Sequence, residues 1–269
     1  MQVINFIYPE KSEIKFHMDT FPDSQSHLVL DTELNRRKSL MCYTRLSCLN
    51  DLWILLQLSD ICNRQGIIFH HLCISYLFAA RTDRLFSFNE ALDLDIVLKL
   101  LKEIKVHNGI SIFEPHSVIK LQTPYSVMYP TYFHEIYQPI TNSPSKIIFP
   151  DEGARLRYNA YYANSCCCTK KREKGIVSIT VPNISEVYND YYVIDDLCDG
   201  GGTFFKLYEN QKNYVKERIH LIVAHAIQRQ ALIDLSKLYK TITITNSFKA
   251  WENEDLPSNI KVIKLYEQI

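Results

Sequence analysis

The chain has 269 residues, which is long for one domain and ordinary for two. Its 46% hydrophobic and 22% charged residues are typical of a soluble globular protein, and its 30 basic residues balance its 30 acidic ones. This balance argues against nucleic-acid binding, and no apolar run reaches the roughly 18 residues of a membrane-spanning helix. The N-terminus has no basic region before its apolar residues, which argues against a signal peptide. We therefore expect a cytoplasmic protein with no nucleic-acid or membrane partner.

The eight cysteines match neither a zinc site nor a disulfide framework. They include no pair of CxxC motifs, and Cys166, Cys167 and Cys168 are adjacent. We expect reduced thiols, as in a reducing compartment. A redox role for the three adjacent cysteines is the less favoured alternative.

In the first half of the chain, apolar runs and turn residues predict strands that alternate with helices. Strands are expected over residues 3–8, 26–30, 41–49, 67–78 and 110–113, and helices over residues 52–64 and 90–106. Residues 21–25 are a predicted turn, Asn50 and Asp51 offer an N-cap, and Gly66 is expected to end the first helix. Residues 125–140, rich in aromatic residues and proline, are expected to be irregular and to lie near a domain junction at residues 138–144.

The second half continues the same pattern. Strands are expected over residues 146–149, 192–194, 219–226, 241–245 and 261–266, and helices over residues 156–163, 204–215 and 229–238. Residues 166–174 are expected to form a short strand that runs into a basic loop. The alternation predicts an α/β fold with two mostly parallel sheets flanked by helices, in domains 1–140 and 141–269. Ligands bind beyond the carboxyl ends of such strands, which predicts site loops at residues 81–84, 114–116, 150–153 and 195–203 and at His225.

Residues 192–204 are the most distinctive stretch, because three of the seven glycines are adjacent there. A predicted apolar strand ends on Asp195 and Asp196, and a glycine turn then leads into a helix. Backbone N–H groups at such a turn bind phosphate, and the two acids stand where a ribose diol or a Mg²⁺-bound phosphate would lie. A plain strand-to-helix turn with a solvated acidic end is the alternative.

Seven segments, taken in order, carry a resemblance to a known family. They are residues 21–25 (FPDSQ), 50–52 (NDL), 80–84 (ARTDR), 114–116 (EPH), 150–153 (PDEG), 170–172 (KKR) and 195–203 (DDLCDGGGT). The set resembles the motifs of the ribose-phosphate diphosphokinase (phosphoribosyl pyrophosphate synthetase) family, which has the type I phosphoribosyltransferase fold. The resemblance implies two phosphoribosyltransferase-like domains, an N-terminal one on the ATP side and a C-terminal one on the ribose-phosphate side.

The resemblance also implies an activity and its site residues. A Mg²⁺-dependent enzyme of this kind transfers the β,γ-diphosphate of ATP to the 1-hydroxyl of ribose 5-phosphate and releases AMP. Lys170 and Arg172, on a mobile loop, would close over the transferring phosphates, and His116 and Asp151 would hold or orient Mg²⁺ and phosphate. The residues implied to bind ATP are Phe21, Asp23, Gln25, Arg81, Thr82, Asp83 and His116.

The ribose-phosphate side follows from the segment 195–203. Asp195 and Asp196 would bind the ribose 2- and 3-hydroxyls, and the 5-phosphate would be wrapped by Asp199, Gly200, Gly201, Gly202 and Thr203. Phe21, Asp23 and Gln25 would reach the adenine of a neighbouring subunit, so the resemblance implies a homo-oligomer.

The chain departs from the family pattern at several positions. Ser24, Gln25, Thr82 and Glu114 replace glycine, glutamate, glutamine and aspartate, so the nucleotide site is altered in detail. Gly200 replaces a threonine in the 5-phosphate loop, which removes a hydroxyl donor and opens space for a phosphodiester. The acceptor is therefore either ribose 5-phosphate, the family's usual substrate, or ADP-ribose, as in phage enzymes that rebuild NAD⁺ in the host cytoplasm. A base-transferring phosphoribosyltransferase and a catalytically silent regulatory subunit are the remaining alternatives.

Overall fold

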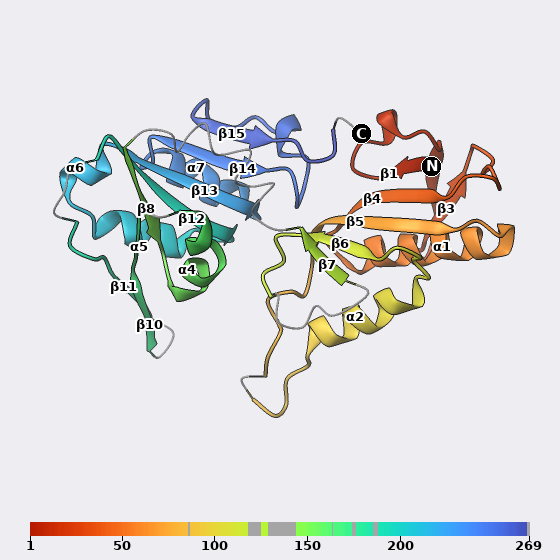
Figure 1. The fold of residues 1–269 in the computed structure, drawn as a ribbon, viewed down its shortest axis with the longest axis horizontal. Helices are drawn as coiled ribbons and strands as arrows, with labels where there is room; N and C mark the ends of the chain where they lie inside the picture. The colour runs from red at the N-terminus through yellow and green to blue at the C-terminus, as the bar shows by residue number, and fades with distance from the viewer. Residues whose placement is uncertain are drawn as a thin grey trace. The chain divides into compact units, whose positions relative to one another are not determined.

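The computed structural model describes residues 1–85, 87–117, 125–128, 144–162, 164–173, 176–184 and 188–267. The chain forms two compact units, each with its own parallel sheet (Figure 1). Unit 1 comprises Met1–Met128, Ser247–Lys249 and Leu265–Ile269, and unit 2 comprises Tyr129–Asn246 and Ala250–Lys264. The predicted α/β class with parallel sheets is confirmed. Residues 138–143 of the predicted junction lie outside the described residues.

Unit 1 contains a five-stranded parallel sheet in the order β1-β4-β5-β6-β7. Its strands are β1 (Gln2–Asn5), β4 (Leu40–Leu46), β5 (Phe69–Leu77), β6 (Ile110–Phe113) and β7 (Tyr125–Met128). The prediction of irregular structure from residue 125 was wrong for β7, which pairs with β6 from Tyr125 onward. The prolines on either side of β7 led to the prediction of irregular structure for these four residues. Residues 129–140 lie outside the described residues.

Two helices cover this sheet, α1 (Leu49–Gln65) and α2 (Asp93–Glu103). The predicted N-cap at Asn50 and Asp51 was wrong, because α1 begins earlier, with Cys48 at the cap. Asp51 stands in the first turn, where its Oδ2 accepts hydrogen bonds from the N–H groups of Ser47 (2.7 Å) and Cys48 (3.1 Å). Gly66 ends the helix as predicted, at φ +69°.

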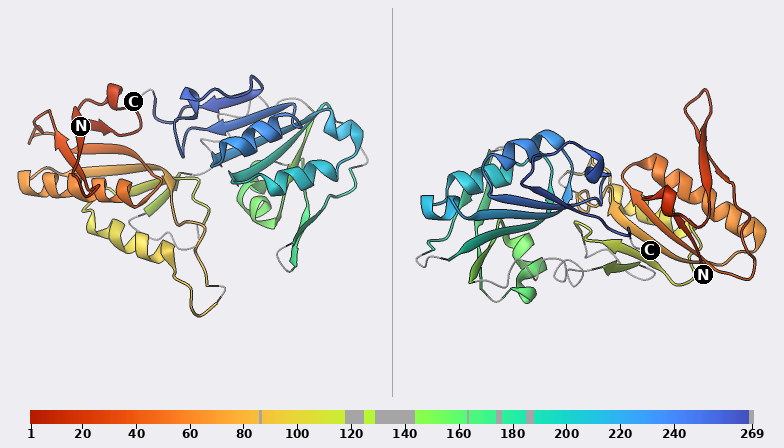
Figure 2. Two further views of the ribbon diagram at one scale, coloured as in Figure 1. Left: turned by 180° about the vertical axis from the view of Figure 1, so that it is seen from behind. Right: turned by 90° about the horizontal axis from the view of Figure 1, so that it is seen from above.

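A hairpin of β2 (Phe16–Thr20) and β3 (Ser26–Leu30) forms a separate antiparallel sheet in unit 1. The predicted turn at residues 21–25 is confirmed, because the N–H of Phe21 donates to the carbonyl of Gln25 at 2.9 Å. The side chain of Gln57 on α1 bonds the backbone of Ser26 and Leu28, at 3.0 and 2.9 Å. The hairpin is thus anchored by its second strand, and its tip stands out from unit 1 (Figure 2).

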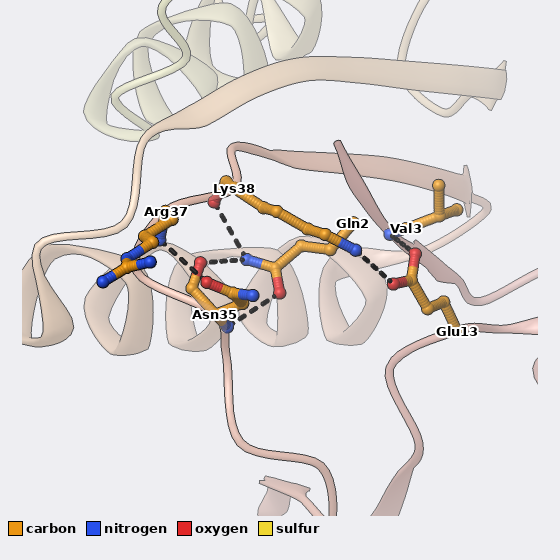
Figure 3. A network of polar contacts seen from close by, with 6 residues as sticks. All are labelled: Gln2, Val3, Glu13, Asn35, Arg37 and Lys38. Carbon is orange, nitrogen blue, oxygen red and sulfur yellow. Dashed lines mark hydrogen bonds and ion pairs between the residues drawn. The ribbon is translucent and has the colours of Figure 1, made fainter.

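A network around Gln2 fixes the chain before β4 to the first strand (Figure 3). The Gln2 side chain is 2% exposed and donates from Nε2 to the carbonyls of Asn35 (3.3 Å) and Lys38 (3.1 Å). Its Oε1 accepts from the N–H of Asn35 at 3.0 Å. Oε2 of Glu13 accepts a hydrogen bond from the N–H of Val3, and Glu13 also forms an ion pair with Lys38. One buried amide therefore satisfies three backbone groups that the sheet leaves unpaired.

The end of the chain returns to unit 1. The hydroxyl of Ser75 on β5 donates to the carbonyl of Ser247 at 2.8 Å, and Ser47 donates to that of Phe248 at 3.0 Å. The ring of Tyr266 lies 4.9 Å from that of Tyr43 on β4. Unit 1 is therefore completed by residues far from it in sequence.

Unit 2 contains a six-stranded parallel sheet in the order β15-β14-β13-β12-β8-β9. Its strands are β8 (Ser145–Phe149), β9 (Ser165–Cys167), β12 (Asp190–Cys198), β13 (Ile219–Ala226), β14 (Thr241–Thr245) and β15 (Ile260–Ile263). Every residue of β13 is buried, as expected for a central parallel strand covered on both faces. The bounds of β13 and β14 are those predicted from the sequence.

The helices of unit 2 are α4 (Glu152–Tyr158), α5 (Gly202–Glu209), α6 (Asn213–Lys216) and α7 (Arg229–Ser236). Helix α4 begins four residues earlier than predicted, because Asp151 accepts a hydrogen bond from the N–H of Ala154 and caps it. Residue 163, the predicted helix end, lies outside the described residues. The predicted helix over residues 204–215 is divided into α5 and α6. Short 3-10 turns are formed by Pro9–Lys11, Asn159–Tyr161 and Trp251–Asn253.

The strands β10 (Thr169–Glu173) and β11 (Ile176–Thr180) form a second hairpin, antiparallel and separate from the main sheet. Sequence analysis predicted a basic loop here, and this was wrong for residues 169–173. Lys170 and Arg172 pair with Ile179 and Val177 across the hairpin. Alternating apolar residues on the second strand give the basic stretch a partner, which extends it.

The described residues include no helix that is both long and apolar enough to cross a membrane. All eight cysteines are free thiols. Burial raises the pKa of Cys166 to about 11 and that of Cys168 to about 12, which keeps both thiols protonated and unreactive at neutral pH. Neither Cys166 nor Cys168 therefore offers the reactive thiolate that the less favoured redox role would need.

A polar cluster ties together the amino-terminal ends of β12, β13 and β14. His220 bonds Asp190 through Nε2 (3.0 Å) and Thr241 through Nδ1 (2.6 Å), and it stacks on Tyr192 at 4.8 Å. Lys240 also donates to Asp190, at 3.1 Å. Burial lowers the pKa of His220, against an opposing effect of Asp190.

This cluster makes the stability of the chain depend on pH. The folded pKa of His220 is below its unfolded value of about 6.5, so the unfolded state binds the proton first as pH falls. The stabilising contribution is present above pH 6.5 and is lost below it. We expect a lower urea midpoint at pH 5.5 than at pH 7.5 and a smaller difference for His220→Asn. An equal pH difference in the variant would contradict this assignment.

Candidate active site

The strand order of unit 2 reverses direction between β8 and β12. From β8 the chain goes outward to β9, whereas β12 and its successors build the sheet on the other side of β8. Such a switch point opens a crevice beyond the carboxyl ends of the two strands, where ligands of open α/β sheets bind. Pairing of β12 with β8 ends at Val193, and β12 continues along β13 to Cys198. We call this part of β12, residues 194–198, the overhang. The site residues of unit 2 lie around it.

The acidic pair lies on the overhang, inside β12. Sequence analysis placed the strand end at Ile194, and this was wrong, because pairing with β13 extends β12 by four residues. Asp196 is buried, Asp195 is half-buried, and the N–H of Asp196 donates to Oδ1 of Asp195 at 2.9 Å. Burial, together with the charges of Asp196 and Asp151, raises the pKa of Asp195 well above its ordinary value. Hydrogen-bond donors or a cation would therefore stabilise the ionised form of Asp195.

Asp151 stands at the end of β8, beside this pair. Its Oδ1 caps α4 through the N–H of Ala154 at 3.1 Å, and its Oδ2 accepts from Nζ of Lys170 at 3.0 Å. The Lys170 side chain is only 13% exposed, so solvent screens this ion pair less than a surface pair. The expected loop residue is therefore anchored on β10, facing the carboxylates. The side chain of Arg172 lies outside the described residues.

The second cation of the site was not predicted from the sequence. Arg157 on α4 lies 3.7 Å from Oδ2 of Asp196, with both side chains about nine-tenths buried. No spacing in the sequence indicated it, because its role depends on a contact across the fold, with Asp196 on β12. Lys170 therefore pairs with Asp151, and Arg157 lies near Asp196. Among the described side chains, these two cations stand beside the three carboxyl groups of Asp151, Asp195 and Asp196.

This donor set is compatible with a hard divalent cation. Magnesium binds proteins through one or two carboxylates and takes its other ligands from substrate phosphates and water. Among the described residues, no group of three or more His, Cys, Asp or Glu side chains could hold a metal by itself. Asp151 fits the role of a single protein ligand in unit 2, because its carboxylate lies at the edge of the cluster and already holds a cation.

The glycine loop has one position where only glycine fits. Gly201 has φ +76° and is buried, and a Cβ there would lie 2.9 Å from Cε2 of Phe205 and 3.1 Å from Cδ1 of Leu235. Gly200 and Gly202 have no such need, since a Cβ at Gly202 meets nothing within 4 Å. Gly201 caps α5, and no acceptor among the described residues bonds the N–H groups of Gly202 and Thr203. These N–H groups are suited to an anion.

Asp199 and His225 complete the carboxyl edge of this sheet. Oδ1 of Asp199 accepts from Nε2 of Gln228 at 2.9 Å, a contact that no sequence motif indicated. His225, on β13 beside Leu197, is 2% exposed and is part of the core.

The predicted nucleotide residues belong to unit 1. Asp83 is 9% exposed, forms two bonds with the guanidinium of Arg84 (2.8 and 3.1 Å) and accepts from Ser117 at 2.8 Å. The Arg84 bonds lower the pKa of Asp83. Asp83 therefore joins the end of β6 to the segment after β5. Arg81, two residues before Asp83, and His116, directly before Ser117, are exposed, and the hydroxyl of Thr82 donates to the carbonyl of Ala79 at 2.9 Å.

The hairpin tip carries the other three predicted nucleotide residues. Phe21 is 47% exposed, and its ring lies 5.7 Å from that of His27. Oδ1 of Asp23 accepts from the N–H of Gln25 at 3.1 Å, which closes the turn around Ser24 at φ +71°. The tip belongs to the separate two-stranded sheet, so the structure groups these residues apart from the main sheet of unit 1.

Comparison with solved structures identifies the architecture. Phosphoribosylpyrophosphate synthetase from Mycobacterium smegmatis has a similar fold, with a TM-score of 0.74 at 14% identity, covering 98% of this chain and 95% of that one. No family model matches the sequence. The sequence is 25% identical to ribose-phosphate pyrophosphokinase from Saccharolobus solfataricus over 253 residues, covering 86% of this chain and 85% of the relative. These findings confirm the resemblance to the ribose-phosphate diphosphokinase family and its fold.

The glycine loop yields a test of its geometry. Gly201→Ala should lower the free energy of unfolding by about 2–4 kcal/mol, through the left-handed backbone and the contact with Phe205. Gly202→Ala is the matched control and should change it by less than about 0.5 kcal/mol. Urea titration of both variants measures this. Equal stabilities would show that the loop does not adopt this conformation.

Proposed function

We propose that this protein is a Mg²⁺-dependent diphosphokinase that transfers the β,γ-diphosphate of ATP to the 1-hydroxyl of ribose 5-phosphate. The products are phosphoribosyl pyrophosphate and AMP. The proposal is supported above all by one observation, the meeting of Asp151, Lys170 and the Asp195–Asp196 pair at the switch point of unit 2. The similarity to ribose-phosphate pyrophosphokinase extends over both units.

The ribose is proposed to lie against the acidic pair. A vicinal diol offers two O–H donors, and Asp195 and Asp196 offer adjacent acceptors at the carboxyl end of β12. Hydrogen bonds from the hydroxyls stabilise the ionised form of Asp195, whose pKa is raised by burial and by the neighbouring acids. The 5-phosphate then takes the N–H groups of Gly202 and Thr203 at the start of α5. Both contacts fix the direction in which the 1-hydroxyl points.

Lys170 is proposed to neutralise the charge of the transferring phosphates, with Arg172 on the same strand. Phosphoryl-transfer enzymes act mainly through positioning and charge neutralisation. The ion pair with Asp151 holds the ammonium group near the site before substrates bind. Asp151 in unit 2 and, separately, His116 in unit 1 are each proposed to bind or orient Mg²⁺ or phosphate, and Mg²⁺ would supply charge neutralisation at the phosphates of ATP.

The nucleotide is proposed to use the exposed residues of unit 1. Arg81 and His116 follow the carboxyl ends of β5 and β6, and Asp83 and Thr82 shape the segment that presents Arg81. Phe21, Asp23 and Gln25 at the hairpin tip are proposed to reach the adenine of a neighbouring copy. A homo-oligomer is part of this proposal.

Replacement of Lys170 tests the proposed chemistry. Lys170→Ala should lower kcat by a factor of about 10³, because the charge that neutralises the transferring phosphates is lost. Lys171→Ala is the matched control, since Lys171 is exposed and points to the opposite face of β10. We expect near-normal kcat for the control and native far-UV circular dichroism for both. Full activity of Lys170→Ala would contradict the proposed role.

ADP-ribose is a second candidate acceptor, and the open space at Gly200 supports it. Gly200 is exposed, has no positive φ, and an added Cβ would lie 3.8 Å from Nε2 of Gln228, an ordinary contact. The backbone therefore does not require glycine here. A side chain is absent beside the proposed 5-phosphate, where a phosphodiester needs room for its second substituent.

Gly200→Thr distinguishes the two acceptors. Since the added side chain fits, the variant should fold normally and add a donor for a phosphate monoester. We expect the ratio of kcat/KM for ribose 5-phosphate to that for ADP-ribose to rise by about tenfold, because one hydrogen bond to a charged group is gained or a substituent is excluded. An unchanged ratio would contradict the assignment of Gly200 to acceptor choice. If the wild-type protein modifies neither acceptor, the silent-subunit alternative is favoured.

A further inference from the structure

The hairpin that carries Lys170 has one buried face. Lys170 and Ile179 lie directly opposite each other on β10 and β11, and opposite residues of an antiparallel pair point to the same face. The Lys170 side chain is 13% exposed and Ile179 is 5% exposed, whereas the next pair, Lys171 and Ser178, is exposed. Because β11 packs along α5, the position of this buried face depends on how the hairpin is held to that helix.

A side chain at the end of α5 holds the hairpin. Among the described strands, β10 and β11 pair only with each other, so the main sheet of unit 2 does not fix them. Nδ2 of Asn210 donates to the carbonyl of Ile179 at 3.0 Å. Asn210 directly follows α5, and its own N–H donates to the carbonyl of Lys206 at 3.2 Å. The last turn of α5 is thus bonded to the residue opposite Lys170.

Helix α5 connects this contact to the proposed 5-phosphate loop. Gly202 and Thr203 open the helix, and Asn210 stands at its other end. An α-helix rises about 1.5 Å per residue, so its two ends are a fixed distance of roughly 12 Å apart. The N–H groups proposed to bind the acceptor phosphate and the strand opposite Lys170 are therefore placed by the same short helix.

We propose that Asn210 is a positioning residue, which fixes β11 to the end of α5 and so sets where Nζ of Lys170 lies relative to the 5-phosphate loop. This inference rests on the proposed function, because that function assigns Lys170 to the transferring phosphates. The ion pair with Asp151 holds Lys170 before substrates bind, and it is given up when the ammonium group turns to the phosphates. The bond from Asn210 does not involve the ammonium group, so it restrains the hairpin throughout the reaction.

The reactivity of the Lys170 amine tests this placement without any measurement of activity. Brief treatment with limiting acetic anhydride acetylates lysines according to their accessibility, and fragment mass analysis reports each site. Asn210→Ala should raise the acetylation of Lys170 relative to Lys171 about fivefold, the factor that corresponds to the roughly 1 kcal/mol of one hydrogen bond. Asn183→Ala is the matched control, because Oδ1 of Asn183 accepts from Lys212 at 2.7 Å, outside the hairpin. The control should leave this ratio unchanged.

Kinetics with the acceptor that the wild-type protein uses identify the route of the effect. Asn210→Ala should lower kcat about fivefold with little change in KM for the acceptor, because the N–H groups of the loop stay in place. In a double-mutant cycle, Asn210→Ala should have no further effect on kcat once Lys170 is alanine. Native far-UV circular dichroism of each variant serves as the folding control.

An unchanged acetylation ratio in Asn210→Ala would overturn the inference and leave the proposed function intact. An equal loss of kcat in both backgrounds, or no loss in either, would do the same. A wild-type protein that transfers diphosphate to neither acceptor would overturn the proposed function and this inference with it.

Discussion

The overhang of β12 beyond the end of β8 determines what the site in unit 2 can do. Because β8 ends at Phe149 and the chain turns there into α4, the acidic end of β12 has a strand on only one side. The cap of α4, Asp151, comes to stand at that edge, and the hairpin residue Lys170 reaches it. A strand order that reverses between β8 and β12 keeps this edge open. Strand length and order therefore assemble acids that lie 44 residues apart in the chain.

The charges at this edge are unequal, and that inequality is useful for the proposed reaction. Among the described side chains, three carboxylates stand beside two cations, and burial together with the charges of Asp196 and Asp151 raises the pKa of Asp195. Hydrogen bonds from sugar hydroxyls and a divalent cation would both reduce the repulsion between these carboxylates. The loop that follows has the opposite character, because the N–H groups of Gly202 and Thr203 have no acceptor among the described residues and are suited to an anion. A ribose phosphate, with a diol at one end and an anion at the other, matches both.

Much of this architecture was predictable from the residue pattern. The bounds of β13 and β14 were predicted correctly from residues rich in isoleucine, valine and threonine, and seven short motifs indicated the family. The errors lay where tertiary pairing decides the outcome: β7 is short and flanked by prolines, and Lys170 is extended only because β11 pairs with β10. Arg157 and Asn210 escaped notice because their roles depend on a contact across the fold, to Asp196 and Ile179 respectively. No local spacing carries that information.

The identity of the nucleotide released from ATP tests the central claim most directly. The protein, purified and incubated with Mg²⁺, ATP labelled at the β-phosphorus and ribose 5-phosphate or ADP-ribose, should release unlabelled AMP. The label should appear in an acceptor that has gained a diphosphate, as mass analysis and phosphorus NMR can show. Release of ADP with a single phosphoryl group on the acceptor would contradict diphosphoryl transfer.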